Sequence, residues 1–499
     1  MRMNLRKYLG MVAPIVALPI GFCPNTAGAA CSPGGNTLRL DADSFGTPGV
    51  YCESPNAHFL DLVTCAHRVD GANYAVGGSI VNDAWIRMLG NAPDPNYKLP
   101  LPSPYTYHLI NLGFNDMRLY GDDSNVGKEV ANRLKSMIAY MRLATIKDDD
   151  NSIAYSPGTP GTWNTTGPLN DMYGKFNHYT GVPGATATTS FSGDRITVGT
   201  FGLCSSAGTI RIKVDNTVKF EQNMGNQCTH HNNYTPYAVE LRNLGSGNHT
   251  LTISKSDSTS GFIYVDYIGV PSVNPPVIIY NGITKMEAER YDDSVYAPYT
   301  NGSDAAVANC NQAISQMIVN SFDLDVVFVD QSNYNPNTEA LICRTAVPVD
   351  FVHPNDAGHL KLQTNISNKW PNIAPRATLS ASSQYSANYA PTKAADMFIG
   401  FQDSGEWASS GQQNPWIQLN WSSNQQVHKV VLYDRKNLTD AANGGTLSFS
   451  DGSTVPVTGI PNNGTRKIVT FPAKNVSWMK FQVSGGSGQN VGLSEVEVF

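Results

Sequence analysis

Three polar side chains from two distant parts of the chain could together carry out acyl transfer through a serine nucleophile. Ser44 follows Asp43 directly after a short hydrophobic run, and Asp350 precedes His353 by three positions in a later segment. At that spacing an Asp350 oxygen can accept the His353 Nδ1–H, which fixes the tautomer and leaves Nε2 free as a base. Ser44 would then be the nucleophile, His353 the general base and Asp350 the residue that orients the base.

Two further positions could stabilise the negative charge that develops on the attacked carbonyl oxygen. Gly78 has no side chain and so leaves its backbone N–H open to a ligand. The amide of Asn115, at the end of a hydrophobic run, could donate a second hydrogen bond to an oxyanion. Each motif alone also has a simpler explanation: a helix cap at Ser44 or Asn115, a plain turn at Gly78, and a solvated histidine at His353.

These side chains need a scaffold that brings strand ends together, and the hydrophobic pattern predicts one. Between 37 and 153, and again between 277 and 370, strand-like runs alternate with helical runs. The expected strands are 37–41, 105–113, 277–280 and 325–330, and the expected helices are 126–141, 307–319 and 356–369. This alternation is typical of a mostly parallel sheet with helices on both faces, which binds ligands beside the carboxyl ends of its strands.

A segment rich in Pro and Gly at 156–161 separates this α/β pattern from a β-rich block. Short β-type runs follow without a convincing helix, as in a β-sandwich, and a second block of that kind ends the chain. The sequence thus predicts a multidomain chain whose α/β domain is split by an insert. The expected segments are a signal peptide (1–30), the α/β domain (31–156 and 276–370), a jelly-roll β-sandwich (157–275), a linker (371–375) and a second β-sandwich (376–499).

The motifs at Ser44, Gly78, Asn115 and Asp350 to His353, in that chain order, resemble the SGNH (GDSL-like) hydrolase family. The resemblance covers the split α/β domain and implies a serine esterase with Ser44, His353 and Asp350 as its triad. It also implies an oxyanion hole formed by the backbone N–H groups of Ser44 and Gly78 and by Asn115 Nδ2. One position departs from the family, because Ala42 stands where the family usually has Gly.

Other catalytic signatures are missing from the sequence. It has no G-x-S-x-G elbow, no H-E-x-x-H pair, no phosphate loop and no dinucleotide glycine fingerprint. The first of these absences argues against an ordinary α/β-hydrolase. We therefore expect an enzyme that uses neither a cofactor nor a metal.

The two β-rich blocks also resemble known modules. The C-terminal block resembles the discoidin (coagulation factor 5/8 type C) sandwich, and its Trp407 and Trp416 are expected in the core rather than as platforms for sugars. The inserted block looks like a carbohydrate-binding jelly roll, or alternatively a structural insert that shapes the rim of the active site. Some SGNH-type peptidoglycan O-acetylesterases resemble this arrangement, which implies glycan binding through the β modules. The segments that match the discoidin sandwich are 377–383, 406–409, 414–419, 430–435 and 491–499.

The first thirty residues predict export. A basic start precedes an apolar stretch at 8–22 that is too short to span a bilayer, and small residues at 27–29 form a cleavage site. Acylation of Cys31 is the alternative. No later apolar run is long enough for a membrane helix, and the formal net charge of −6, without a basic patch, argues against binding of nucleic acid.

Cysteines in an exported protein indicate disulfides first. Proximity in the sequence suggests the pairs Cys52–Cys65, Cys204–Cys228 and Cys310–Cys343, with Cys31 unpaired. Cys228 is followed closely by His230 and His231, so a metal cluster is the alternative at that position.

Taken together, these patterns predict a secreted carboxylester hydrolase that removes acetyl or another short acyl group from a polysaccharide. The same site could instead serve an acyltransferase or a lipid-directed esterase. A third hypothesis is an inactive carbohydrate-binding adhesin, whose only support is Ala42 before the Asp-Ser pair.

Overall fold

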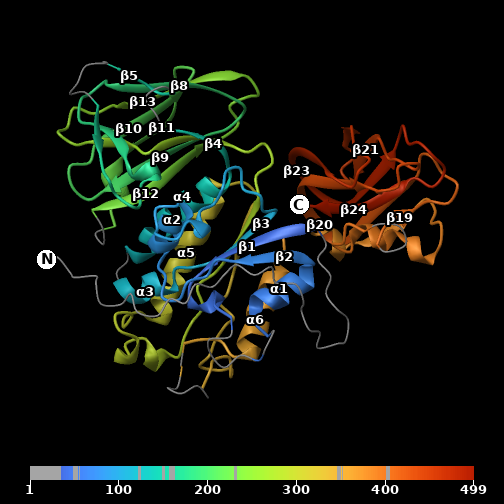
Figure 1. Ribbon diagram of the computed structural model, residues 1–499, viewed down its shortest axis with the longest axis horizontal. Helices are drawn as coiled ribbons and strands as arrows, with labels where there is room; N and C mark the ends of the chain where they lie inside the picture. Colours follow the sequence, from blue (N-terminus) through green and yellow to red (C-terminus); the bar gives the residue numbers. More distant parts are fainter. Residues whose placement is uncertain are drawn as a thin grey trace.

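The chain forms an α/β body, an inserted β-sandwich and a C-terminal β-sandwich, each built around hydrophobic side chains (Figure 1). The computed structural model describes residues 35–48, 54, 57–121, 125–148, 152–156, 163–229, 233–344, 350, 352–400 and 405–499. The expected signal peptide, Cys31, Cys52, His230 and His231 lie outside the described residues. Among the described helices, none combines the length and apolar character that a bilayer span requires.

A five-stranded sheet in the order β17-β16-β3-β1-β2 forms the centre of the α/β body, and each neighbouring pair is parallel. Strands β3 and β16 are buried along their whole length, as expected for strands covered on both faces. Because the strands are parallel, their carboxyl ends meet at one edge of the sheet. The strands are β1 (Asn36–Ala42), β2 (Val69–Asn73), β3 (Tyr107–Asn111), β16 (Val277–Asn281) and β17 (Val326–Val329).

Helices cover both faces of this sheet (Figure 1). Helices α1 (Phe59–His67) and α6 (Asp356–Asn368) pack together on one face. The other face carries α2 (Val81–Met88), α3 (Phe114–Tyr120), α4 (Val126–Met141) and α5 (Asp304–Ser321). The bounds of α4 agree with the predicted helix, because its apolar residues recur at helical spacing and all of them are buried.

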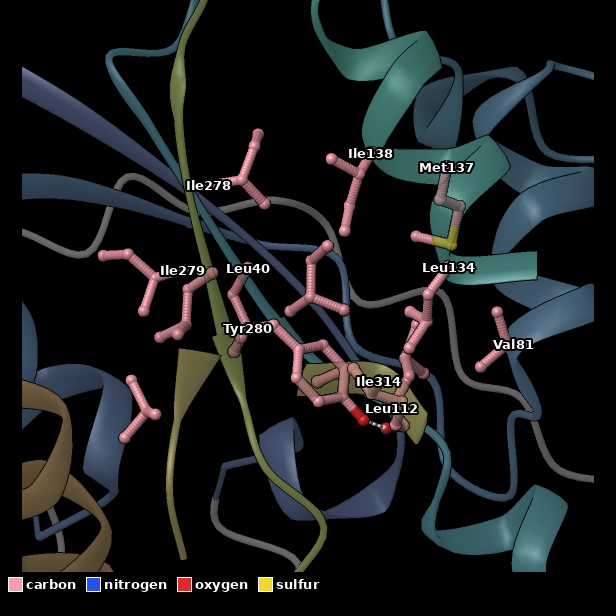
Figure 2. Close-up of a cluster of buried hydrophobic side chains, with 14 of the residues drawn as sticks. Leu40, Val81, Leu112, Leu134, Met137, Ile138, Ile278, Ile279, Tyr280 and Ile314 are labelled. Carbon is pink, nitrogen blue, oxygen red and sulfur yellow. Dashed lines mark hydrogen bonds between the residues drawn. The ribbon is translucent and has the colours of Figure 1, made fainter. Parts of the chain in front are cut away.

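The core of the α/β body lies on both faces of the sheet, and one part of it is packed between the sheet and the helices α4 and α5. Figure 2 shows Ile278 and Tyr280 of β16 beside Leu134 and Ile138 of α4. The Tyr280 hydroxyl donates to the Leu112 carbonyl at 2.7 Å, which satisfies a polar group inside this core. Burial of each such aliphatic side chain contributes roughly 1.5–3 kcal/mol.

The inserted β-sandwich begins earlier than the predicted boundary at residue 156. Strand β4 (Leu143–Lys147) follows α4 and pairs with β15 (Tyr267–Pro271) in a four-stranded sheet of order β12-β9-β15-β4. The opposing sheet has the order β11-β10-β13-β8-β5, and a small sheet has the order β14-β7-β6. The remaining strands are β5 (Ala154–Ser156), β6 (Asn164–Thr166), β7 (Asn177–Thr180), β8 (Thr186–Ser192), β9 (Ile196–Leu203), β10 (Thr209–Val214), β11 (Thr217–Asn223), β12 (Tyr234–Leu241), β13 (Asn248–Lys255) and β14 (Ile263–Val265).

The C-terminal β-sandwich has strands in the order β19-β24-β20-β23-β21-β22, and β18 pairs with β20. Trp407 is fully buried and its Nε1–H donates to the Ser383 carbonyl at 2.9 Å, so this residue belongs to the core, as expected. Trp416 is only half-buried. The strands are β18 (Thr378–Ala381), β19 (Trp407–Ala408), β20 (Trp416–Asp434), β21 (Gly444–Phe449), β22 (Thr454–Thr458), β23 (Arg466–Val483) and β24 (Gly492–Val498).

The C-terminal β-sandwich docks at the edge of the parallel sheet where the strands begin. The Asn36 amide at the start of β1 donates to a Glu497 carboxylate oxygen at 2.7 Å, and Lys429 forms an ion pair with Asp325, just before β17. A cavity of about 300 Å³ lies at this junction, where all three bodies meet. This cavity therefore lies at the edge of the sheet opposite Ser44.

The inserted β-sandwich packs over α2 and α4. The Trp85 indole of α2 donates to the Asp171 carbonyl at 2.9 Å, and the Lys128 ammonium of α4 donates to the Cys228 carbonyl at 3.0 Å. Strand β12 also packs along α4. The insert is thus held by the helical layer on one face of the sheet.

The disulfide predictions had mixed outcomes. Cys204 and Cys228 are bonded, which confirms that pair and leaves Cys228 without the free thiolate that a metal site needs. The predicted pair Cys310–Cys343 is wrong, because Cys343 is disulfide-bonded whereas Cys310 is a free thiol buried in α5. Burial raises the pKa of Cys310 to about 12, so it remains a protonated, apolar packing residue. Cys65 is also disulfide-bonded.

We expect the substitution Asp325→Asn to weaken docking of the C-terminal β-sandwich, because it leaves Lys429 buried without its counter-charge. Unfolding in urea at neutral pH should show a loss of about 3 kcal/mol. The exposed Asp292→Asn variant is the control and should change stability by no more than about 0.5 kcal/mol.

The pH dependence supplies a second readout for the same variant. Burial alone would raise the pKa of Asp325, but Lys429, His428 and Arg142 outweigh it and hold the pKa below its ordinary value. A carboxyl with a depressed pKa stabilises the fold above its unfolded pKa and loses that contribution as the pH falls. The difference between wild type and Asp325→Asn should therefore narrow in acid, and an equal difference at all pH values would contradict this account.

Candidate active site

Ser44 lies in a tight turn at the carboxyl end of β1. Residues Ser44–Gly46 form one turn of 3-10 helix, and the Asp43 carboxylate caps this turn by accepting the Phe45 N–H at 3.0 Å. A Cβ at Gly46 would lie 2.5 Å from the Ala42 Cβ and 2.7 Å from the Ala75 Cβ. The turn therefore needs glycine at position 46, and it accommodates the methyl group of Ala42 where the resemblance leads one to expect Gly.

The structure brings Ser44, His353 and Asp350 together in one hydrogen-bonded chain. His353 Nε2 lies 2.8 Å from Ser44 Oγ, and His353 Nδ1 lies 2.5 Å from Asp350 Oδ2. The other Asp350 oxygen accepts the Val352 N–H at 2.8 Å and the His353 N–H at 3.2 Å. This geometry places a base beside the hydroxyl and an acceptor behind the base, as nucleophilic catalysis requires.

Asp350 is held in its charged form. Burial alone would raise its pKa, but the hydrogen bond and charge interaction with His353 and the two backbone N–H groups outweigh burial. The pKa of Asp350 consequently lies below its ordinary value. A charged Asp350 stabilises the imidazolium that His353 becomes when it accepts a proton.

The loop that carries His353 is braced by a neighbouring segment and by α6. The Cys343 N–H donates to the His353 carbonyl at 2.9 Å, and the Asn355 N–H donates to the Leu341 carbonyl at 3.0 Å. Asn355 also caps α6 by accepting the Gly358 N–H at 3.0 Å. Backbone bonds on both sides of His353 therefore fix where its ring can point.

Two of the predicted oxyanion donors are backbone N–H groups, one of Ser44 itself and one of Gly78 in a neighbouring turn. A Cβ at Gly77 would lie 3.8 Å from the Ser44 Cβ, so the Gly77–Gly78 turn faces the nucleophile. Gly78 has a φ of 73°, a backbone conformation that favours glycine. In the part of the chain that the structure describes, no group accepts a hydrogen bond from the N–H of Ser44 or of Gly78. Both donors are therefore available to a ligand.

Asn115 is buried in the first turn of α3, and it does not bond to Ser44 directly. One hydrogen of its Nδ2 is donated to the Ser79 carbonyl at 3.1 Å, beside the Gly77–Gly78 turn. An amide nitrogen carries two hydrogens, so the second can be donated to a ligand while the first holds the loop.

A network of amide side chains ties the strand ends together behind the site. Asn281, at the end of β16, donates to Asn111 at 2.5 Å and accepts from Gln331, which follows β17. Gln331 in turn accepts from Asn365 of α6 at 2.7 Å. Since the network is buried and its members satisfy one another, it fixes α6 and the nearby His353 loop against the sheet. These residues could not be predicted from the sequence, because isolated Asn and Gln side chains form no pattern.

Two buried carboxyl groups flank the site. Burial raises the pKa of Asp43 to about 7, although its hydrogen bond from the Phe45 N–H opposes the rise. Burial also raises the pKa of Asp116 to about 7, although Asp116 accepts the Val81 N–H at the start of α2. Asp43 adjoins Ser44 and Asp116 adjoins Asn115, so both lie within the motifs found in the sequence. That these carboxyl groups are buried became apparent only in the tertiary structure.

No arrangement of three or more His, Cys, Asp or Glu side chains suited to a metal ion occurs within the described ranges. The residues around Ser44 offer hydrogen-bond donors and one base instead. What they can do chemically is activate a hydroxyl and hold an oxyanion.

The family model and the structural neighbours named below each match about a quarter of the chain. Residues 372–499 match the family model "Domain of unknown function (DUF7402)", and none of the curated proteins compared is significantly similar. Chitosan-binding module 1 of a chitosanase/glucanase from Paenibacillus sp. IK-5 is 26% identical, with 26% of this chain and 98% of that chain covered and a TM-score of 0.22. The family 32 carbohydrate-binding module of NanJ from C. perfringens is 18% identical, with 26% and 96% covered and a TM-score of 0.23.

The lectin domain of Lectinolysin is a further structural neighbour, 22% identical, with 26% of this chain and 95% of that chain covered and a TM-score of 0.22. The three named neighbours are carbohydrate-binding or lectin modules, and none of them is an ester hydrolase.

We expect Gly46→Ala to distort the nucleophile turn, because the added methyl group would meet two Cβ atoms that cannot rotate away. Stability should fall by about 2 kcal/mol, measured by thermal unfolding. Gly247→Ala is the matched control, since a Cβ at that position meets nothing within 4 Å. Equal stability of the two variants would show that the turn relaxes without cost.

We expect Asp43→Asn to change how stability depends on pH. A carboxyl whose pKa is raised in the folded state stabilises the fold below its unfolded pKa, and that contribution is lost as the pH rises through about 7. The asparagine variant does not titrate, so its stability relative to wild type should rise by on the order of 2 kcal/mol between pH 5 and pH 8. The exposed Asp70→Asn variant serves as the control. If the stability of wild type and of Asp43→Asn changed in parallel with pH, the raised pKa of Asp43 would be refuted.

Proposed function

We propose that the chain is a secreted serine carboxylester hydrolase of the SGNH type, which removes acetyl or another short acyl group from a polysaccharide. The observation that carries the proposal is the hydrogen-bonded chain from Ser44 through His353 to Asp350, with 2.8 Å between Ser44 Oγ and His353 Nε2. The order of the motifs along the sequence and the parallel sheet that positions them support the SGNH assignment. The basic and apolar segments of the N-terminus support export.

In the proposed reaction, His353 Nε2 accepts the Ser44 proton while Ser44 Oγ attacks the ester carbonyl carbon. The oxyanion that forms is stabilised by the N–H groups of Ser44 and Gly78 and by the second hydrogen of Asn115 Nδ2. The carbon–oxygen bond to the alcohol then breaks, and His353 returns the proton to the leaving oxygen. Water, activated by His353, attacks the acyl-enzyme and releases the acid and free Ser44.

The choice of a polysaccharide as the acyl carrier rests on the resemblance of the C-terminal block to the discoidin sandwich and of the insert to a jelly roll. The C-terminal β-sandwich docks at the edge of the sheet opposite Ser44. Its docking contacts therefore do not involve the edge that carries Ser44.

The competing function is a carbohydrate-binding adhesin without catalysis. The family model that matches residues 372–499 covers only the C-terminal β-sandwich and leaves the α/β body untested, so the match is compatible with both functions. The assembled triad is what favours the enzyme, since an adhesin has no need of a base 2.8 Å from a serine hydroxyl.

We expect Ser44→Ala to lower kcat by roughly 10⁴-fold or more, because the acyl-enzyme can no longer form. Turnover of p-nitrophenyl acetate and acyl release from acetylated xylan, pectin, peptidoglycan and lipid esters are the measurements. Exposed Ser332→Ala is the matched control and should keep wild-type activity.

Equal activity of wild type and Ser44→Ala would reject the proposed site. Rapid labelling of Ser44 by a fluorophosphonate would reject the inactive adhesin. Product analysis with an added glycan acceptor separates hydrolysis from acyl transfer, because a hydrolase releases the acid whether or not the acceptor is present.

A further inference from the structure

Tyr299 reaches the oxyanion side of the site from a distant part of the chain. It lies in the segment between β16 and α5, and its hydroxyl donates to the Gly78 carbonyl at 2.6 Å across a sequence separation of 221 residues. Its ring also lies against Gly78, because a Cβ at that glycine would be 3.7 Å from the Tyr299 hydroxyl and 4.0 Å from its Cε2. Tyr299 itself is half-buried.

The turn that Tyr299 contacts has few other restraints on the direction of its N–H groups. The Val76 N–H donates to the Ala42 carbonyl at 3.0 Å, and the Ser79 N–H donates back to the Val76 carbonyl at 3.2 Å. Gly77 and Gly78 between them have no side chains, and glycine rotates more freely about φ and ψ than any other residue. An unanchored turn could therefore point the Gly78 N–H away from Ser44.

Three side chains restrain the carbonyl groups of this turn, and one of them is Ser79 itself, whose hydroxyl donates to the Val76 carbonyl at 2.7 Å. Tyr299 holds the Gly78 carbonyl, and Asn115 holds the Ser79 carbonyl at 3.1 Å. The Gly78 carbonyl shares its peptide plane with the Ser79 N–H, so the Tyr299 bond fixes the plane that follows Gly78. This narrows the orientations open to the preceding Gly77–Gly78 peptide, which carries the Gly78 N–H. A donor that is already oriented stabilises an oxyanion without reorganisation during the reaction.

The Tyr299 hydroxyl stays protonated at neutral pH. Burial, together with the carboxyl groups of Asp83, Asp116 and Asp43, raises the pKa of Tyr299 to about 12. The hydroxyl is thus a permanent donor to the Gly78 carbonyl.

We propose that Tyr299 is a positioning residue for the oxyanion hole, which it orients by holding the Gly78 carbonyl through its hydroxyl. This inference rests on the proposed esterase function, and it assigns to the segment between β16 and α5 a role that the sequence motifs do not reveal. Tyr299 acts through Gly78 and takes no part in proton transfer.

The test is Tyr299→Phe, which removes the hydroxyl and keeps the ring. We expect kcat to fall about tenfold while KM stays within about twofold, because removal of an oxyanion donor itself costs about 10²–10³-fold and an indirect effect is smaller. Affinity for an alkylboronic acid, which mimics the tetrahedral intermediate on Ser44, should fall in parallel with kcat. The free energy of unfolding should fall less than in the Tyr433→Phe control, because Tyr299 is only half-buried and water can replace its hydroxyl.

Tyr433→Phe is the matched control. That buried tyrosine donates to Glu497 at 3.2 Å in the C-terminal β-sandwich, so its variant should lose stability and keep kcat. Suppose that wild type is active and Ser44→Ala is not. If Tyr299→Phe then keeps the kcat and the boronate affinity of wild type, the positioning role of Tyr299 is overturned and the proposed esterase function stands. An inactive wild type would overturn the proposed function and this inference together, and a fall in kcat of equal size in Tyr433→Phe would show that the effect is merely structural.

Discussion

The hydrogen bond between His353 Nε2 and Ser44 Oγ depends on the parallel arrangement of the central sheet. Ser44 follows β1 and His353 lies in the loop before α6, and the two residues are separated by 309 positions. Parallel strands end at the same edge, so loops from distant parts of the chain meet there. The insert can lie between the two halves without disturbing the site, because it leaves the α/β body after α4 and returns at β16.

Polar contacts behind the site keep these loops in place. The amide network that runs from Asn111 to Asn365 joins the ends of β3 and β16 and the segment after β17 to α6. The backbone bonds at Cys343 and Asn355 hold the His353 loop. Catalytic groups must be held within a fraction of an ångström to be effective, so such supporting contacts matter as much as the reacting side chains. Their burial also gives the α/β body a single arrangement, because an unsatisfied buried amide would cost about 1–3 kcal/mol.

The two β modules are joined to the α/β body by polar contacts rather than by flexible linkers alone. Asp325 pairs with Lys429 of the C-terminal β-sandwich, and Asp323, two positions earlier, pairs with Arg195 of the insert. One short segment before β17 therefore anchors both modules. Because these contacts are at the start of the strands, changes in the modules can alter stability without touching the triad.

The sequence alone was enough to identify local features. Helix α4 follows from apolar residues at helical spacing, the pair Asp350 and His353 from three-residue spacing, and the Cys204–Cys228 bond from proximity. Strand β2 was missed, because a short edge strand with polar residues has little hydrophobic pattern.

The tertiary structure decided everything that depends on contacts between distant segments. It assigned β4 to the insert through pairing with β15, left Cys310 unpaired in a buried helix face, and brought Tyr299 to Gly78. Periodicity and spacing record only what neighbouring residues do along one helix or strand. Which strand pairs with which, and which buried group gains a partner, is set by the packing of the whole chain.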